Sequence, residues 1–281
     1  PLIAAMVDRA VQDCLALAED LAADKDEAPA ADDGRPVSKS SAKTVPAQAV
    51  AAQVASTKTA SVQPALARKG EACARLMETL SLTGVAMQMM KSSRPASGSD
   101  HQISHLLEMR DIQQHRQGSL HGDKVGIGTL IGMTLYLRLF KGRQLPEQRP
   151  VLSAERWQAE VRRVYGPLAD QALAINPAEP PQGELWESQK RQIERAMDQF
   201  GYDIVDSFQT LLPEARDKIL AMGGPVRPDQ LGYSVQDTYD AIAFGKENRP
   251  KFTTLRLAER FGYLYDLAEE IATGLPEGKI Y

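Results

Sequence analysis

The stretch His121-Gly-Asp-Lys-Val-Gly-Ile-Gly-Thr-Leu-Ile-Gly-Met-Thr-Leu-Tyr-Leu-Arg-Leu-Phe-Lys141 predicts one long helix that begins at Gly122. Gly126-Ile-Gly128 within it is a fragment of a nucleotide-binding glycine motif, but that motif joins a strand to a helix, whereas this fragment lies inside a helical run. The small residues more simply indicate close packing of a second helix. The apolar part ends at Phe140 and is interrupted by Arg138, too short for the roughly 18 residues of a membrane span.

Apolar residues recur at helical spacing along most of the remaining chain, and convincing strands or βαβ alternation are absent. We therefore expect an all-α fold. Gly223-Gly-Pro225 and Asn248-Arg-Pro250 should end helices. The expected helices cover residues 2–23, 67–90, a segment holding His101 and His105, 153–165 with Ser153 as N-cap, 185–200, 202–222 with Pro213 kinking or breaking it, 234–245 and 253–273.

Residues 24–66 differ from both flanks, because Ala, Ser, Lys, Thr, Gln and Pro dominate and no aromatic residue occurs. Such a segment buries too little apolar area to offset its chain entropy, so we predict a disordered insertion. An Ala-rich helix that folds on a partner is the alternative. The expected organisation is a first helix of the helical domain at 1–23, the insertion at 24–66, and the rest of the all-α domain at 67–281.

The composition is that of a globular protein, with 43% hydrophobic residues among 281 and a formal net charge of −4. This excludes a sequence-wide basic field for nucleic acid. The two cysteines, Cys14 and Cys73, lie in apolar helical patterns without CxxC spacing, so we expect reduced, buried thiols in a cytoplasmic protein. Asp8 interrupts any signal-peptide pattern. The chain opens on Pro1 without an initiator methionine, which indicates a fragment.

All four histidines, His101, His105, His115 and His121, fall within 21 residues of one another. The first two are four apart, hence on one helix face, with Asp100 placed to cap that helix or to support a ligand. His121 sits at the start of the next helix, so the two helix starts can converge on one divalent ion. A solvated helix face is the alternative.

The turn before the first histidine pair carries Ser92, Ser93, Arg94, Ser97 and Ser99. Hydroxyls, a guanidinium and backbone N–H groups beside a helix start suit a phosphate or another anion. The same residues also suit plain helix capping, and both interpretations stay open. Glu259, Glu269 and Glu270 fit the polar face of an amphipathic helix.

Three motifs carry a family resemblance: Ser92-Ser-Arg-Pro-Ala-Ser-Gly-Ser-Asp-His-Gln-Ile-Ser-His105, His121-Gly-Asp-Lys-Val-Gly-Ile-Gly-Thr-Leu130 and Glu247-Asn-Arg-Pro-Lys-Phe-Thr-Thr-Leu-Arg256. They resemble the C-terminal half of the sn-glycerol-1-phosphate dehydrogenases, within the larger family of iron-containing, metal-dependent alcohol and glycerol dehydrogenases. The likeness covers residues 67–271 well and residues 2–23 weakly.

The resemblance implies a dehydroquinate synthase-like architecture, in which a Rossmann-like N-terminal domain, absent from this chain, binds NAD(P) and a helical C-terminal domain supplies metal ligands. His101 and His121 would bind Zn²⁺ (or Ni²⁺ or Fe²⁺), and His105 would contact dihydroxyacetone phosphate. The implied reaction is hydride transfer to that ketone, giving sn-glycerol 1-phosphate for phospholipid biosynthesis. The resemblance also implies a homo-oligomer. Arg94 is our own candidate for binding the anionic end of the substrate, inferred from its charge.

Two departures from the family bear on activity. A third metal ligand, an aspartate upstream of this domain, has no counterpart, since Asp8 lies in the wrong context. The cofactor domain is missing as well, so we expect this chain alone to bind metal poorly and not to turn over substrate. A glycerol or other alcohol dehydrogenase of the same fold is one alternative function. A non-catalytic helical module, with the insertion recruiting a partner, is another.

Overall fold

A computed structural model describes residues 70–176 and 180–281. The chain divides into two compact units, residues 1–92 and 93–281, and each is considered by itself. Within the described residues all regular elements are helices, which confirms the all-α class. The expected helix at 2–23, the insertion at 24–66 and Cys14 lie outside those residues. No helix in the described part is long and apolar enough to cross a membrane.

In the first unit, a helix covers residues 70–90, as the sequence predicts. Ala72, Thr79 and Ala86 are buried along one stripe at seven-residue spacing. Cys73 is exposed, so the expectation of a buried thiol is wrong for this residue. The reason is helical geometry, since Cys73 is rotated by about 100° from the buried stripe.

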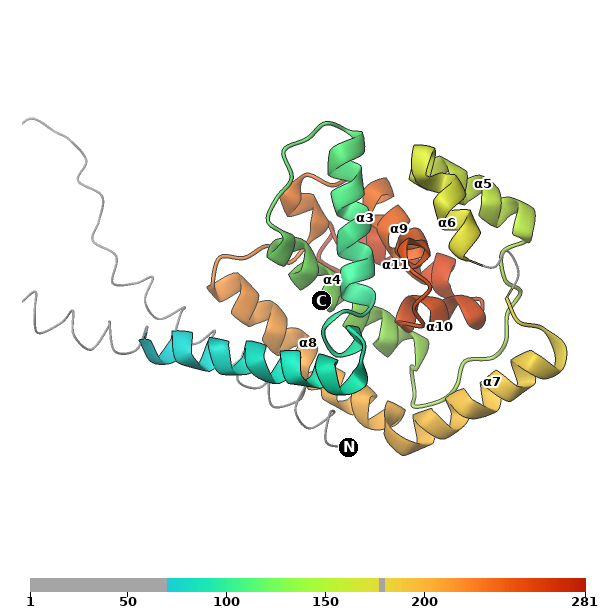
Figure 1. Cartoon of the computed structure of the whole chain (residues 1–281), viewed down its shortest axis with the longest axis horizontal. Helices are drawn as coiled ribbons and strands as arrows, with labels where there is room; N and C mark the ends of the chain where they lie inside the picture. Colours follow the sequence, from blue (N-terminus) through green and yellow to red (C-terminus); the bar gives the residue numbers. More distant parts are fainter. Residues whose placement is uncertain (1–69, 177–179) are drawn as a thin grey trace, which may run out of the picture. The chain divides into compact units, whose positions relative to one another are not determined.

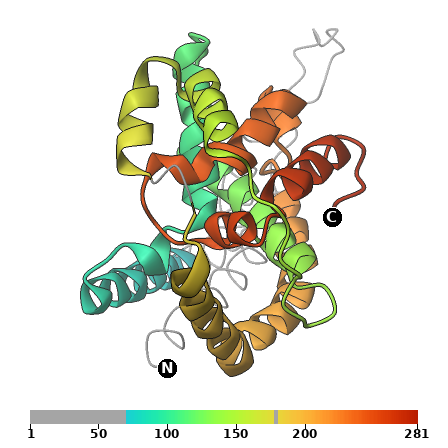
Figure 2. The same ribbon diagram turned by 90° about the vertical axis from the view of Figure 1, so that its right-hand side faces the viewer.

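The second unit is built around two antiparallel helices, α3 (Ser99–Gln113) and α4 (His121–Leu139). A Cβ added to Gly128 would lie 2.5 Å from the carbonyl oxygen of Asp100, and one added to Gly132 would lie 3.7 Å from Cβ of Ser99. The glycines therefore let α4 approach α3 closely, as the sequence indicates. α4 also contacts α8, α10 and α11 (Figures 1 and 2), so it is the central helix of this unit.

α8, α9, α10 and α11 pack on that pair, and α9, which contacts α3, lies side by side with α11 (Figure 1). α5 packs on α6 and α9. Their shared core includes Ile103, Leu107, Ile131, Phe244 and Phe261, all fully buried. The helices are α5 (Ala154–Tyr165), α6 (Ala169–Ile175), α7 (Gly183–Ala196), α8 (Tyr202–Ala221), α9 (Val235–Phe244), α10 (Thr254–Arg260) and α11 (Leu264–Gly274).

Helix caps follow local chemistry closely. Ser153 caps α5, and its hydroxyl accepts a hydrogen bond from the backbone N–H of Arg156. Ser234 caps α9 in a capping box with Asp237. The hydroxyl of Ser234 accepts a hydrogen bond from the backbone N–H of Asp237, and the carboxylate of Asp237 accepts one from the backbone N–H of Ser234. Both starts agree with the sequence prediction, because such caps need only neighbouring residues.

One expected helix, at 253–273, is two helices. α10 ends before Gly262, whose φ of +79° belongs to the left-handed region that favours glycine. A Cβ at this position would also lie 2.6 Å from the carbonyl oxygen of Arg149, so only glycine fits the close approach of the 149–150 segment. The apolar periodicity continues across the break, which is why the sequence alone suggested one helix.

The remaining differences concern helix ends. Pro213 lies inside α8 without breaking it, so the expected break is absent. α7 continues into α8 through a π-helical turn at Met197–Gly201, where the sequence suggested separate helices. α6 was not expected at all, since its seven residues are too few for a clear period.

Candidate metal centre

Three histidine rings meet where α3 passes the start of α4. The ring centroids of His101 and His105 are 5.9 Å apart, those of His101 and His121 are 5.5 Å apart, and those of His105 and His121 are 5.6 Å apart. The α3 pair shares a face because four residues make about one turn, and the antiparallel packing brings His121 to it. His115 lies in the connecting loop with φ +51° and takes no part in these ring contacts.

Glu108 joins the histidines to one another. Its Oε1 lies 2.6 Å from Nδ1 of His121, and its Oε2 lies 3.0 Å from Nδ1 of His105. Ligand atoms of these three residues all fall within 4.8 Å of one another, a spacing that could hold one metal ion. Sequence analysis missed Glu108, although its position three residues after His105 places it on the same helix face. The assignment of His101 and His121 as ligands stays a prediction.

The surroundings favour the ionised form of Glu108. Its side chain is 30% exposed, and burial by itself would raise the pKa of this carboxyl. Hydrogen bonds from His121 and His105, together with the charge of each ring, outweigh that effect and lower the pKa. A carboxylate held charged between two imidazoles is the donor set that zinc and related divalent ions bind.

Asp100 supports the third ring. Its Oδ1 accepts a hydrogen bond from the backbone N–H of Gly98 at 2.7 Å, and its Oδ2 lies 2.6 Å from Nδ1 of His101. Asp100 therefore closes the turn before α3 and lies against His101. The N-cap of α3 is Gly98, without a side-chain cap, and the support of a metal ligand by Asp100 stays a prediction. A carboxylate on Nδ1 leaves Nε2 as the ligand nitrogen, the usual arrangement around protein-bound metals.

A buried cluster one turn further along both helices fixes the distance between them. Asp111 Oδ2 lies 3.1 Å from Nζ of Lys124 and accepts a hydrogen bond from the hydroxyl of Tyr233 at 2.6 Å. Lys124 is 3% exposed and also donates to the carbonyl of Ser119 in the connecting loop. Asp111 follows Glu108 by three residues in α3, and Lys124 follows His121 by three residues in α4. The Asp111–Lys124 ion pair therefore helps to hold α3 and α4 in the alignment that brings Glu108 to His121.

A second group of polar side chains lies beside the start of α3. Arg94 is exposed and opens a short 3-10 helix, Arg94–Ala96. Lys251, from the segment before α10, donates from Nζ to Oγ of Ser93 at 2.8 Å and to Oγ of Ser97 at 3.5 Å. The structure thus brings a lysine that sequence analysis missed to the turn that was singled out for anion binding.

Behind α3 lies a buried ionic network. Glu247 is fully buried between Lys246, whose Nζ lies 2.8 Å from Oε1, and Arg256, whose guanidinium lies 2.9 Å from Oε2. Glu259 bonds both cations and is 12% exposed. The prediction that Glu259 lies on an exposed polar face is therefore wrong, because the break at Gly262 turns α10 toward the core. Glu269 and Glu270 are exposed, as predicted.

This network is tied to the histidine helix through a 3-10 turn, Gly245–Asn248. The side-chain amide of Asn248 donates to the carbonyl of Gln102 at 3.3 Å, and a Cβ on Gly245 would lie 2.7 Å from that same oxygen. Gln102 directly follows His101 in α3. The buried charges therefore support the helix that carries the site, without contacting the rings themselves.

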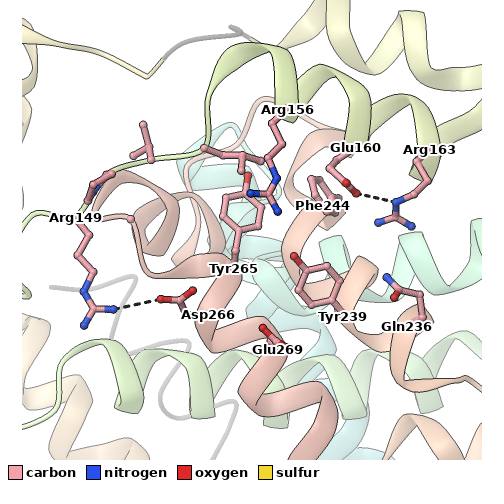
Figure 3. A pocket seen from close by; sticks show the side chains of 14 residues that line it. Arg149, Arg156, Glu160, Arg163, Gln236, Tyr239, Phe244, Tyr265, Asp266 and Glu269 are labelled. Atoms are coloured by element: carbon pink, nitrogen blue, oxygen red, sulfur yellow. Dashed lines mark hydrogen bonds and ion pairs between the residues drawn. The ribbon is translucent and has the colours of Figure 1, made fainter.

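A cavity of about 800 Å³ lies elsewhere, between α5, α9 and α11 (Figure 3). Its rim carries paired charges, with Arg149 3.3 Å from Asp266 and Arg163 2.7 Å from Glu160. None of the histidines lines it. The candidate site is therefore defined by the side chains at the α3–α4 junction and does not coincide with this cavity.

An all-α unit that collects three histidines and a glutamate from two helices is a helical domain with a candidate divalent-metal centre. No family model matches the chain. The chain is similar to curated proteins named "Glycerol-1-phosphate dehydrogenase [NAD(P)+]". That of Bacillus licheniformis is 26% identical over 190 residues, covering 68% of this chain and 35% of the relative.

Two further relatives carry the same name. That of Geobacillus thermodenitrificans is 33% identical over 127 residues, covering 36% of this chain and 31% of the relative. That of Saccharolobus solfataricus is 52% identical over 56 residues, covering 20% of this chain and 15% of the relative. The resemblance drawn from the motifs is confirmed, and the matches span about a third or less of the relatives' length.

Proposed function

We propose that this chain is the metal-binding helical part of an NAD(P)-dependent dehydrogenase that reduces dihydroxyacetone phosphate to sn-glycerol 1-phosphate. The observation that carries the proposal is the convergence of three histidine rings, all within the motifs that resemble that enzyme, with Glu108 from the helix segment between these motifs. The printed names of the relatives agree with the activity and with the cofactor. The enzyme would act as a homo-oligomer in the cytoplasm and supply a phospholipid precursor.

The donor set fits Zn²⁺, Ni²⁺ or Fe²⁺, since imidazole and carboxylate ligands suit all three. His101 and His121 would hold the ion, which would polarise the substrate carbonyl as a Lewis acid. Asp100 and Glu108 would keep the rings oriented through Nδ1, because a charged carboxylate retains the proton on that nitrogen. The role of this chain is therefore to position the ketone and to complement the negative charge that forms on its oxygen.

His105 would contact the substrate. Glu108 accepts a hydrogen bond from Nδ1 of His105, so the proton stays on that nitrogen. Nε2 is then the atom that can accept a hydrogen bond from a substrate hydroxyl or exchange a proton with it. We therefore propose that Nε2 of His105 orients the hydroxyl end of dihydroxyacetone phosphate.

The test compares histidine variants of the full-length gene product. His101→Ala and His121→Ala should each lose most of the bound metal, measured by elemental analysis, together with NADH oxidation by dihydroxyacetone phosphate. His115→Ala is the matched control, because this histidine lies outside the cluster, and it should keep both properties. Normal metal content and activity in both site variants would contradict the proposal and favour a non-catalytic module.

Two further comparisons refine the assignment. If glycerol or dihydroxyacetone supports turnover as well as the phosphorylated substrate does, the glycerol dehydrogenase alternative is correct. The isolated 281-residue chain, supplied with zinc or nickel, should bind metal weakly and should not oxidise NADH. Detectable turnover by that chain would contradict our expectation that an upstream aspartate and a cofactor domain are required.

A further inference from the structure

Lys251 occupies an unusual setting for a surface lysine. Its Nζ donates to the hydroxyls of Ser93 and Ser97, and among the described residues no carboxylate forms an ion pair with it. The lysine is only partly exposed, and its two partners lie 158 and 154 residues away in the sequence. An ammonium group held by neutral hydroxyls keeps its full positive charge available for an anion.

The backbone around this lysine is fixed on the histidine helix. Thr253 donates from its hydroxyl to Oε1 of Gln102 at 2.6 Å, and Asn248 donates to the carbonyl of the same glutamine. Nε2 of Gln102 is buried and has no hydrogen-bond partner. Gln102 directly follows His101, so Lys251 is anchored to the same turn of α3 that presents the first histidine.

Other groups at this place also favour an anion. Arg94 is exposed on the same turn as the two serines. The turn leads directly into the N-terminus of α3, a 15-residue helix whose dipole favours negative charge. The carboxylate of Asp100 is hydrogen-bonded to the N–H of Gly98 and lies against His101, and no ion pair joins it to Lys251 among the described residues.

We propose that Lys251, Ser93, Ser97 and Arg94 form the subsite for the phosphate group of the substrate. The phosphate oxygens replace the serine hydroxyls as acceptors for the ammonium, and the freed hydroxyls then donate to the phosphate. This inference rests on the proposed function for its ligand, dihydroxyacetone phosphate. It makes Lys251 the residue that separates a phosphorylated triose from unphosphorylated glycerol.

Anion binding can be tested without turnover. The full-length gene product is titrated with inorganic phosphate, dihydroxyacetone phosphate and dihydroxyacetone at constant ionic strength, and binding is followed by backbone amide NMR shifts of residues 93–105. Lys251→Met should weaken both phosphate-bearing probes about tenfold, because one charge-assisted hydrogen bond is lost. Lys251→Arg should recover much of the affinity, and Ser97→Ala should lose a smaller part. Lys141→Met is the control, an exposed lysine two residues beyond α4.

The outcomes separate this inference from the proposed function. Equal phosphate affinity in the wild type and in Lys251→Met, or equal losses in Lys251→Met and Lys141→Met, would overturn the phosphate subsite. Binding of Co²⁺ is measured on the same samples by its visible absorption. Lysine-dependent phosphate binding without any Co²⁺ binding would support the subsite and would refute the metal-dependent function.

Discussion

Removal of the charge on Glu247 should destabilise the helical unit strongly. The carboxylate is fully buried and accepts from Lys246, Arg256 and the indole N–H of Trp157, the last at 2.9 Å. Burial alone would raise the pKa of Glu247, but the charges of Lys246 and Arg256 and the hydrogen bonds from Lys246 and Trp157 lower it from 4.5 to about 2. The native structure therefore binds the charged form far better than the neutral form.

The pKa shift gives the size of the effect. At 1.36 kcal/mol per pKa unit, the drop from 4.5 to about 2 corresponds to about 3 kcal/mol of unfolding free energy at pH 7. Glu247→Gln keeps the shape and the acceptor for Trp157 but loses the charge, so it should cost about that much. Because the folded pKa is lowered, this contribution is present above pH 4.5 and is lost as the pH falls toward 2.

Urea unfolding measures this directly, with tryptophan fluorescence as the signal; Trp186→Phe in both proteins leaves Trp157, inside the network, as the reporter. The wild type and Glu247→Gln are compared at pH 7 and at steps down to pH 3, where the difference between them should shrink. Glu277→Gln serves as a control, since its ion pair with Lys279 is well exposed. A cost below about 1 kcal/mol at pH 7, or a difference that does not change with pH, would refute the reasoning.

Three further predictions concern the α3–α4 junction. Gly128→Ala should cost about 1–3 kcal/mol in urea unfolding because its Cβ meets backbone of α3, whereas Gly122→Ala, with open space around it, should cost little. Lys124→Met should cost less than the roughly 3–5 kcal/mol of a buried charge that loses its sole partner, because Arg116 still lies 3.3 Å from the carboxylate of Asp111; an unchanged midpoint would show that the Lys124–Asp111 pair is unimportant. Glu108→Gln should weaken Co²⁺ binding about 10- to 100-fold, and an unaltered dissociation constant would exclude Glu108 from the site.

Local chemistry determined several helix starts and which residues share a helix face. The start of α5 at Ser153 and of α9 at Ser234 follow from caps that need only a few neighbouring residues. The shared face of His101 and His105 follows from four-residue spacing in a helix. The glycines around Gly128 predicted that a second helix packs closely on α4, but not that this helix is α3. These features depend on residues within one or two turns, so the sequence by itself predicts them.

Tertiary structure decided the features that join distant segments. The contact of Glu108 with His121 needs the loop between α3 and α4 to close, and Lys251 reaches the serine turn across more than 150 residues. Glu247 is buried only because three partners converge on it. Sequence periodicity reports which residues share a face of one helix, but it carries no information about which other segment covers that face. The physical reason is that a charge can be buried only where oppositely charged partners offset the cost of removing it from water. Those partners come from distant parts of the chain, so no local sequence pattern identifies them.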